Sequence, residues 1–137
     1  MLEDRILRSE DDTISFAKEL APTLKQGDVL ALYGELGAGK TFFTKQLCKY
    51  LGVQENVSSP SYILMNEYVG NYTIRHLDLY RLDAAEEVLE LGLYDLFEDS
   101  ITIIEWPEIA DGMLPDNTVH IYFEFDGQKR KVRIKRN

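Results

Sequence analysis

The chain has 137 residues, of which 45% are hydrophobic and 28% are charged, and its formal net charge is −9. This composition is typical of a soluble globular protein, so we expect one domain over residues 1–137 and no disordered tract. The negative charge argues against autonomous binding to nucleic acid, because such binding requires a basic face that neutralises phosphates.

The sequence favours a cytoplasmic location. No apolar run approaches the ~20 residues that a membrane span requires, and the first twelve residues, MLEDRILRSEDD, are too acidic for a signal or transit peptide. The single cysteine, Cys48, fits a reducing compartment. We expect this thiol to pack in a helix beside Phe43, Leu47 and Leu51 rather than to react.

Basic residues are concentrated at the C-terminal end. Residues 129–137 (KRKVRIKRN) hold six of the fifteen lysines and arginines and no acid, whereas residues 82–128 hold neither lysine nor arginine. Strand alternation places Val132 and Ile134 on one face and Lys131, Arg133 and Lys135 on the other. This pattern favours a solvated or edge-protecting face, and an RNA-binding or protein-docking face is the alternative.

The first half of the chain alternates strand and helix patterns. Residues 3–8 predict a short edge strand, and residues 13–24 have apolar residues at helical spacing, with Asp11 or Asp12 as the N-cap. Pro22 predicts a kink or an early end of that helix. The apolar run at residues 28–33 is typical of a buried strand, and residues 40–51 predict a helix that closes at Gly52.

The second half adds antiparallel strands. Residues 62–80 predict two strands joined at Gly70 and Asn71, and residues 84–99 predict two short helices separated by Gly92. Residues 101–105 (ITIIE) predict a buried strand, and the last segment predicts a hairpin that turns at Asp126 and Gly127. The pattern therefore predicts an α/β, P-loop NTPase-like three-layer fold with a mixed central sheet, in which antiparallel strands and a C-terminal hairpin flank a parallel core.

The segment GELGAGKT, residues 34–41, matches the phosphate-binding loop pattern G-x-x-x-x-G-K-[ST] between a predicted strand and a predicted helix. Glycines let the backbone N–H groups form a concave row around an anion, and the following helix directs its positive dipole end at the same anion. Lys40 is expected to contact the β and γ phosphates, and Thr41 to ligate Mg²⁺. The expected nucleotide contacts in this segment are Gly34, Glu35, Leu36, Gly37, Ala38, Gly39, Lys40, Thr41 and Phe42.

Such a site also needs a carboxylate at the end of a neighbouring strand, which holds Mg²⁺ and orients the attacking water. Glu105 ends the strand ITIIE, and Asp78 lies in HLDLYR, where alternation places it on one face with His76. We expect both carboxylates to be functional. His76 is expected to be packed or hydrogen-bonded rather than a catalytic base, and Trp106, next to Glu105, is either a core residue or a contact of the nucleotide.

Five segments in this order and spacing resemble the TsaE family, also called YjeE, over almost the whole chain: GELGAGKT, SSPSY, HLDLYRL, LGLYDLF and IIEWPE. The resemblance implies an ATPase that uses ATP and Mg²⁺, with Lys40, Asp78 and Glu105 as catalytic residues. Thr41 and Glu105 are then the metal ligands. Thr13 and Trp106 are implied near the nucleotide.

The resemblance also implies a switch near the γ phosphate and a set of partners. The switch residues are Ser59, Pro60, Ser61 and Tyr62, and Ser61 departs from the threonine usual in the family, which removes a methyl group and its χ1 stiffness. Family members act with TsaB and TsaD, which transfer a threonylcarbamoyl group to adenosine 37 of tRNAs reading ANN codons. The resemblance implies that ATP hydrolysis resets that complex and that tRNA is contacted only through it.

Three other functions are compatible with a phosphate-binding loop to different degrees. The sequence argues against a regulatory GTPase, because the chain lacks both an Asn-Lys-x-Asp segment and an Asp-x-x-Gly switch. A small-molecule kinase usually closes a lid carrying arginines over the phosphoryl group, but residues 82–128 have none, which leaves Arg75 and Arg81 to act within the chain. A binding module that uses ATP without hydrolysing it remains an alternative to a slow ATPase.

Overall fold

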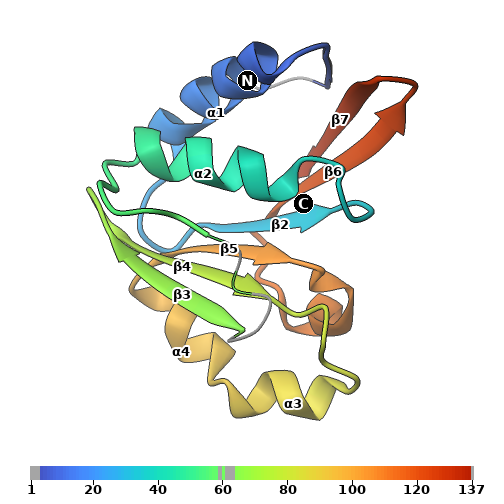
Figure 1. Ribbon diagram of the computed structural model, residues 1–137. Coiled ribbons are helices and arrows are strands. Elements are labelled where there is room, and N and C mark those ends of the chain that lie inside the picture. The colour runs from blue at the N-terminus through green and yellow to red at the C-terminus, as the bar shows by residue number, and fades with distance from the viewer. Residues whose placement is uncertain (1–3, 59, 61–63, 137) are drawn as a thin grey trace.

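The computed structural model describes residues 4–58, 60 and 64–136 (Figure 1). Over these residues the chain forms one sheet of seven strands in the order β1-β7-β6-β2-β5-β4-β3. The strands are β1 (Arg5–Leu7), β2 (Val29–Tyr33), β3 (Met65–Val69), β4 (Thr73–Asp78), β5 (Ile101–Glu105), β6 (Val119–Asp126) and β7 (Lys129–Arg136).

The centre of the sheet is parallel and its edges are antiparallel. β2 pairs in parallel with β5 and β6, and β4 pairs in parallel with β5. The remaining pairs, β1 with β7, β6 with β7 and β3 with β4, are antiparallel. β5 is buried at every position, as expected for a central parallel strand covered on both faces. The predicted mixed sheet is thus confirmed.

Helices cover both faces of the sheet. α1 (Glu10–Leu20) and α2 (Lys40–Tyr50) lie on one face, where Phe16 stacks on Phe43 with ring centroids 5.1 Å apart. α3 (Ala85–Glu90), α4 (Leu93–Glu98) and the 3₁₀ segment η2 (Pro107–Met113) lie on the other. Cys48 is fully buried in the α2 layer, and burial raises the pKa of its thiol to about 12, so the predicted packing role is confirmed.

The prediction for the start of α1 was wrong. Ser9 is the N-cap, and its hydroxyl accepts a hydrogen bond from the Asp12 backbone N–H at 3.3 Å. Asp12 lies in the first turn instead, where its carboxylate accepts from the Arg8 N–H at 2.8 Å. The predicted early end is confirmed, because α1 stops at Leu20 and a 3₁₀ turn, η1 (Ala21–Thr23), holds Pro22.

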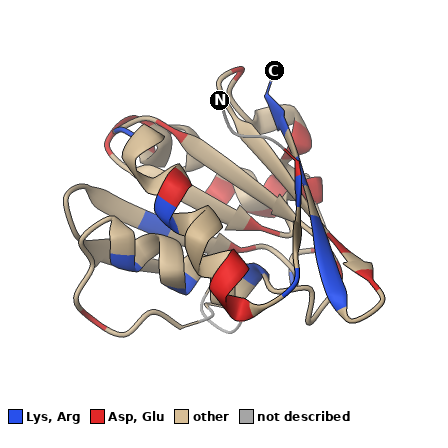
Figure 2. Ribbon diagram, turned by 90° about the horizontal axis from the view of Figure 1, so that it is seen from above, with Lys and Arg blue, Asp and Glu red and all other residues tan. Residues whose placement is uncertain are grey.

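The predicted hairpins and the break at Gly92 are confirmed. Gly92 has φ of 70° between α3 and α4, and β7 buries Val132 while the alternating Lys131, Arg133 and Lys135 are exposed on the other face. Figure 2 shows this strand, which ends at the C-terminus, coloured largely for lysine and arginine. Its outer face is solvated, but β7 is not an edge strand because β1 pairs with it. Within the described residues, no helix has the length and apolarity needed to cross a membrane.

Candidate nucleotide-binding site

A glycine-rich loop joins β2 to α2. Gly34, Gly37 and Gly39 have φ angles of 147°, 82° and 104°, in the region that disfavours side chains. A Cβ on Gly34 would lie 2.6 Å from the Phe123 backbone oxygen, so this position has no space for a side chain. Gly39 precedes the first residue of α2 and has no side-chain cap, so the N–H groups of the first turn face the loop.

Lys40 extends into the loop from the start of α2. Its Nζ donates to the Gly34 carbonyl oxygen at 2.5 Å and lies 3.7 Å from the centroid of the Trp106 ring. The side chain is only 4% exposed. Burial lowers the pKa of Lys40, although the nearby Glu105 and Asp78 carboxylates oppose this effect. The ammonium group is thus held inside the loop without a direct carboxylate partner in the described residues.

Trp106 forms one wall of the site and has an unusual backbone conformation. Its φ and ψ are both 55°, in the left-handed region that costs a non-glycine residue energy. The ring also contacts that of Tyr80, with centroids 4.8 Å apart. Trp106 therefore lines the first cavity beside Lys40, and its contact with nucleotide stays a prediction.

Two carboxylates end neighbouring parallel strands at the same edge of the sheet. Asp78 is the last residue of β4 and Glu105 the last of β5, and they are register partners. Both are buried, with exposed fractions of 4% and 3%. Asp78 Oδ1 accepts from the Tyr80 N–H at 3.0 Å, and Glu105 Oε1 accepts from the Thr41 hydroxyl at 3.4 Å. The sheet thus brings the loop, Thr41 and both predicted carboxylates together.

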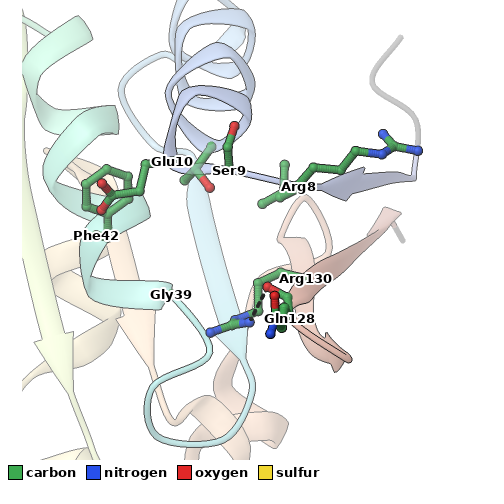
Figure 3. Close-up of a pocket in the computed structure, with 9 residues that line it drawn as sticks. Arg8, Ser9, Glu10, Gly39, Phe42, Gln128 and Arg130 are labelled. Carbon is green, nitrogen blue, oxygen red and sulfur yellow. Dashed lines mark hydrogen bonds between the residues drawn. The ribbon is translucent and has the colours of Figure 1, made fainter.

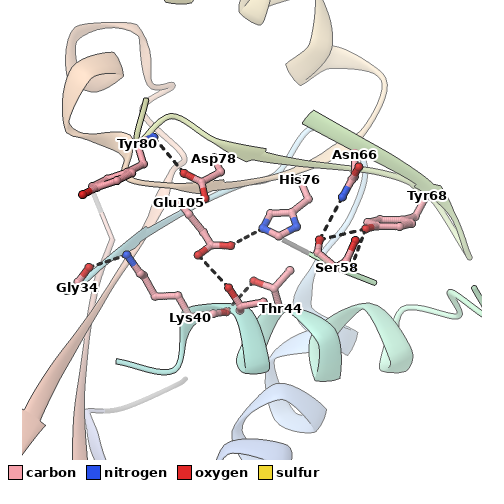
Figure 4. A network of polar contacts seen from close by, with 11 residues as sticks. Gly34, Lys40, Thr44, Ser58, Asn66, Tyr68, His76, Asp78, Tyr80 and Glu105 are labelled. Carbon is pink, nitrogen blue, oxygen red and sulfur yellow. Dashed lines mark hydrogen bonds and ion pairs between the residues drawn. The ribbon is translucent and has the colours of Figure 1, made fainter. Parts of the chain in front are cut away.

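His76 completes the buried network shown in Figure 4. Its Nε2 lies 2.6 Å from Glu105 Oε2, and its side chain is fully buried. The prediction that His76 is packed and hydrogen-bonded is therefore confirmed. Its partner could not be predicted from the sequence, because it lies 29 residues away on another strand.

Two cavities meet at the start of α2. The first, of about 280 Å³, lies between the loop and the two carboxylates. The second, of about 300 Å³, lies between α1, α2 and β7 (Figure 3). Gly39 and Phe42 line both, so the cavities are adjacent. The second also includes Thr13, as well as Leu7, Arg8, Ser9, Glu10, Gln128 and Arg130.

The donor set fits a magnesium ion that binds together with phosphate. Among the described residues there is no group of three or more His, Cys, Asp or Glu side chains placed to hold a metal ion. Mg²⁺ usually keeps several waters and takes one or two carboxylates plus phosphate oxygens. The Thr41 hydroxyl and the Glu105 carboxylate, which lie together at the edge of the first cavity, match that requirement.

The remaining predicted site residues belong to the glycine-rich loop and to the predicted switch. In the loop, Ala38 is buried, whereas Leu36 is 67% exposed and Glu35 lines a separate surface pocket with Tyr33. Of the predicted switch, Pro60 is buried and its carbonyl oxygen accepts from the Leu64 N–H at 2.8 Å. The predicted switch residues Ser59, Ser61 and Tyr62 lie outside the described residues.

Arg75, one of the two arginines that could act within the chain, does not point to the phosphate loop. Arg75 pairs with Glu67 and Asp99 and donates to the Leu96 carbonyl oxygen at 3.2 Å, so it is directed toward α4 and away from the loop. Arg130, which the sequence did not single out, donates to the Gly37 carbonyl oxygen at 3.4 Å. No local motif marks Arg130, because the contact joins positions 93 residues apart.

The fold and the loop define a protein of the P-loop nucleotide-binding class. The family model of "Threonylcarbamoyl adenosine biosynthesis protein TsaE" matches residues 7–133, so the chain belongs to the TsaE family. A Rickettsia bellii protein named "tRNA threonylcarbamoyladenosine biosynthesis protein TsaE" is 41% identical over 132 residues, which cover 94% of this chain and 92% of the relative.

A relative with the same name from Bacillus subtilis is 35% identical over 123 residues, covering 88% of this chain and 77% of the relative. The crystal structure of Bacillus subtilis YdiB superimposes with a TM-score of 0.81 at 29% identity. That superposition covers 96% of this chain and 82% of the other. The similarity thus extends over nearly all of the fold described above.

Proposed function

We propose that the chain binds Mg-ATP, hydrolyses it slowly when alone, and acts with TsaB and TsaD in the cytoplasm. The process is the threonylcarbamoyl modification of adenosine 37 in tRNAs reading ANN codons. The observation that supports ATP binding most strongly is the convergence of Lys40, Thr41, Asp78 and Glu105 on one cavity beside the glycine loop. The names of the relatives support the tRNA process.

Each residue has a chemical role in this proposal. The loop N–H groups and Lys40 bind the phosphates, and Thr41 and Glu105 hold Mg²⁺, which would neutralise developing charge on the phosphoryl group. Asp78, at the neighbouring strand end, orients the attacking water. The second cavity, which contains Thr13 and begins at Gly39, receives the nucleoside.

Slow hydrolysis follows from the distribution of cations. Among the residues that line the first cavity, Lys40 is the only cation. Arg75 is directed to α4, and Arg130 lines the second cavity, where it donates to the Gly37 carbonyl oxygen. Since an arginine that reaches the transferred phosphoryl group adds ~10³ to 10⁵ in rate, we infer that the partner assembly supplies the missing stabilisation. The same absence argues against the alternative of a small-molecule kinase.

ATP turnover by the chain alone, with TsaB and TsaD, and with added tRNA tests this function. We expect turnover well below the ~10 s⁻¹ of a median enzyme for the chain alone, and a rise of at least about tenfold with the partners. Glu105→Gln should abolish the rise while leaving ATP bound. Glu90→Gln, at an exposed position of α3, is the matched control and should behave as the wild type.

Three outcomes would contradict parts of the proposal. Turnover of ~10 s⁻¹ or more without partners would contradict the proposal that hydrolysis is slow until the partners stimulate it. ATP binding with no turnover in any mixture would instead support a binding module that does not hydrolyse ATP. Equal turnover of the wild type and Glu105→Gln would exclude Glu105 from the site.

A further inference from the structure

His76 is a fully buried polar side chain in a layer otherwise suited to apolar residues. It lies in the middle of β4 opposite Ile103 of β5, and Ile74, two residues earlier on the same face of the strand, is also fully buried. Burying an imidazole is unfavourable unless its nitrogens have partners. The contact with Glu105 is therefore what His76 provides at this position and what an apolar side chain could not.

Only one of the two ring nitrogens of His76 is paired. Nε2 lies 2.6 Å from Glu105 Oε2, while Nδ1 is buried and has no hydrogen-bond partner among the described residues. A ring that donates through Nε2–H leaves only a lone pair unpaired at Nδ1, and an unpaired buried acceptor is better tolerated than an unpaired buried N–H. The surroundings thus select the Nε2–H tautomer, which donates to the carboxylate.

The two oxygens of Glu105 have different partners. Oε2 accepts from His76, and Oε1 lies 3.4 Å from the Thr41 hydroxyl at the entrance of the first cavity. Without the donor at Oε2, the glutamate side chain would be free to rotate about its χ angles, with a loss of order in the oxygen that faces the cavity. A hydrogen bond from a neighbouring group commonly orients a carboxylate that ligates a metal.

We propose that His76 is a positioning residue that holds Glu105 in the orientation required to bind Mg²⁺ together with nucleotide. This proposal depends on the proposed Mg-ATP function, because it concerns the same carboxylate. His76 itself contacts neither the phosphate nor the metal. Loss of the His76 side chain should therefore raise the Mg²⁺ concentration that the site requires. Nucleotide affinity in the absence of the metal should not change.

Three variants separate positioning from a structural role. His76→Leu fills the volume but removes the donor, whereas His76→Gln retains an N–H group near the place of Nε2. Thr102→Val is the matched control, because it removes a different buried hydrogen bond, to the Ser100 hydroxyl at 3.1 Å, on the strand that carries Glu105. Trp106 is the only tryptophan and lies at the site, so its emission reports on nucleotide binding.

The measurement is the Mg²⁺ concentration that gives half of the emission change at fixed ADP. We expect His76→Leu to raise this midpoint by about 10- to 100-fold. His76→Gln should have a midpoint close to that of the wild type, and Thr102→Val should match the wild type. ADP affinity without Mg²⁺ should stay constant throughout. In the Glu105→Gln background, His76→Leu should cause no further change. A wild-type midpoint in folded His76→Leu would overturn the proposal.

The ring nitrogens provide a second test that requires no nucleotide. Long-range ¹H–¹⁵N spectra of the free protein should show the Nε2–H tautomer of His76, with an Nε2 shift that changes in Glu105→Gln. An Nδ1–H tautomer would overturn the proposal even if all variants bind nucleotide. If the wild type shows no response to Mg-ADP but the spectra are as expected, the proposed function fails while the His76–Glu105 contact stands.

Discussion

Lys40 is a buried cation with no carboxylate in direct contact among the described residues. Its Nζ has the Gly34 carbonyl oxygen and the Trp106 ring as neighbours, and burial lowers its pKa. A lysine with a lowered pKa makes the folded state bind fewer protons than the unfolded chain at pH values between the two pKa values. The cost is therefore fully present below the folded-state pKa of Lys40 and diminishes as pH rises through that interval.

Replacing the Lys40 ammonium group should weaken ATP binding without lowering the stability of the nucleotide-free protein. Lys40→Met keeps the apolar stem, so we expect an equal or higher free energy of unfolding for the nucleotide-free protein in urea at pH 7. ATP affinity should fall by about 10- to 150-fold, since a charge-assisted contact of ~1.5 to 3 kcal/mol is lost. Lys45→Met, at an exposed position of α2, is the control. Unchanged ATP affinity in Lys40→Met would contradict the site assignment.

At the scale of elements, the start of α1 is defined by one side chain. Ser9 caps the helix, and three acidic residues, Glu10, Asp11 and Asp12, occupy the first turn. Acidic groups there are favourable because they interact with the positive end of the helix dipole. Acidic residues near the start of a helix therefore do not by themselves identify the cap, which is the reason that the sequence prediction failed at this point.

Removing the cap should cost measurable stability. We expect Ser9→Ala to lower the free energy of unfolding by about 1 kcal/mol, because the Asp12 N–H loses its side-chain acceptor. Asp11→Ala, at an exposed first-turn position, should cost less, about 0.3 to 1 kcal/mol from the dipole alone. Urea unfolding of both variants checks this, and an equal loss in the two would contradict the assignment of the cap.

At the scale of the whole molecule, α2 is held against the β3–β4 hairpin by backbone contact. The Asn71 N–H donates to the Leu51 carbonyl oxygen at 2.8 Å, just after α2 ends. A Cβ on Gly70 would lie 2.4 Å from that same oxygen and 2.9 Å from the Val53 nitrogen. The hairpin tip and the end of the P-loop helix therefore approach so closely that only glycine fits.

This contact gives a test of packing at a distance from the site. Gly70→Ala should lower the free energy of unfolding by about 1 to 3 kcal/mol, because the backbone must move to accommodate the methyl group. Gly112→Ala has no neighbour within 4 Å of the added Cβ and should change stability little. Thermal or urea unfolding distinguishes them. A neutral Gly70→Ala would show that the hairpin and helix do not meet as described.

The sequence by itself determined the features that depend on neighbouring residues. Glycine spacing and the following helix located the phosphate loop, and apolar runs located β2 and β5. The rule that ligands of α/β folds bind at the carboxyl ends of strands then brought Glu105 into the prediction, and strand alternation placed Asp78 on one face with His76. These inferences succeed because backbone conformation and hydrophobic burial follow from local residue types and their periodicity.

Only the tertiary structure decided which distant residues meet. The register of β4 on β5 pairs His76 with Glu105 through their side chains, and the β6–β7 hairpin delivers Arg130 to Gly37. Neither contact has a local signature, because strand order and register depend on the packing of the whole sheet between its helix layers. The loop motif thus follows from the sequence, whereas the groups that orient it depend on the assembled fold.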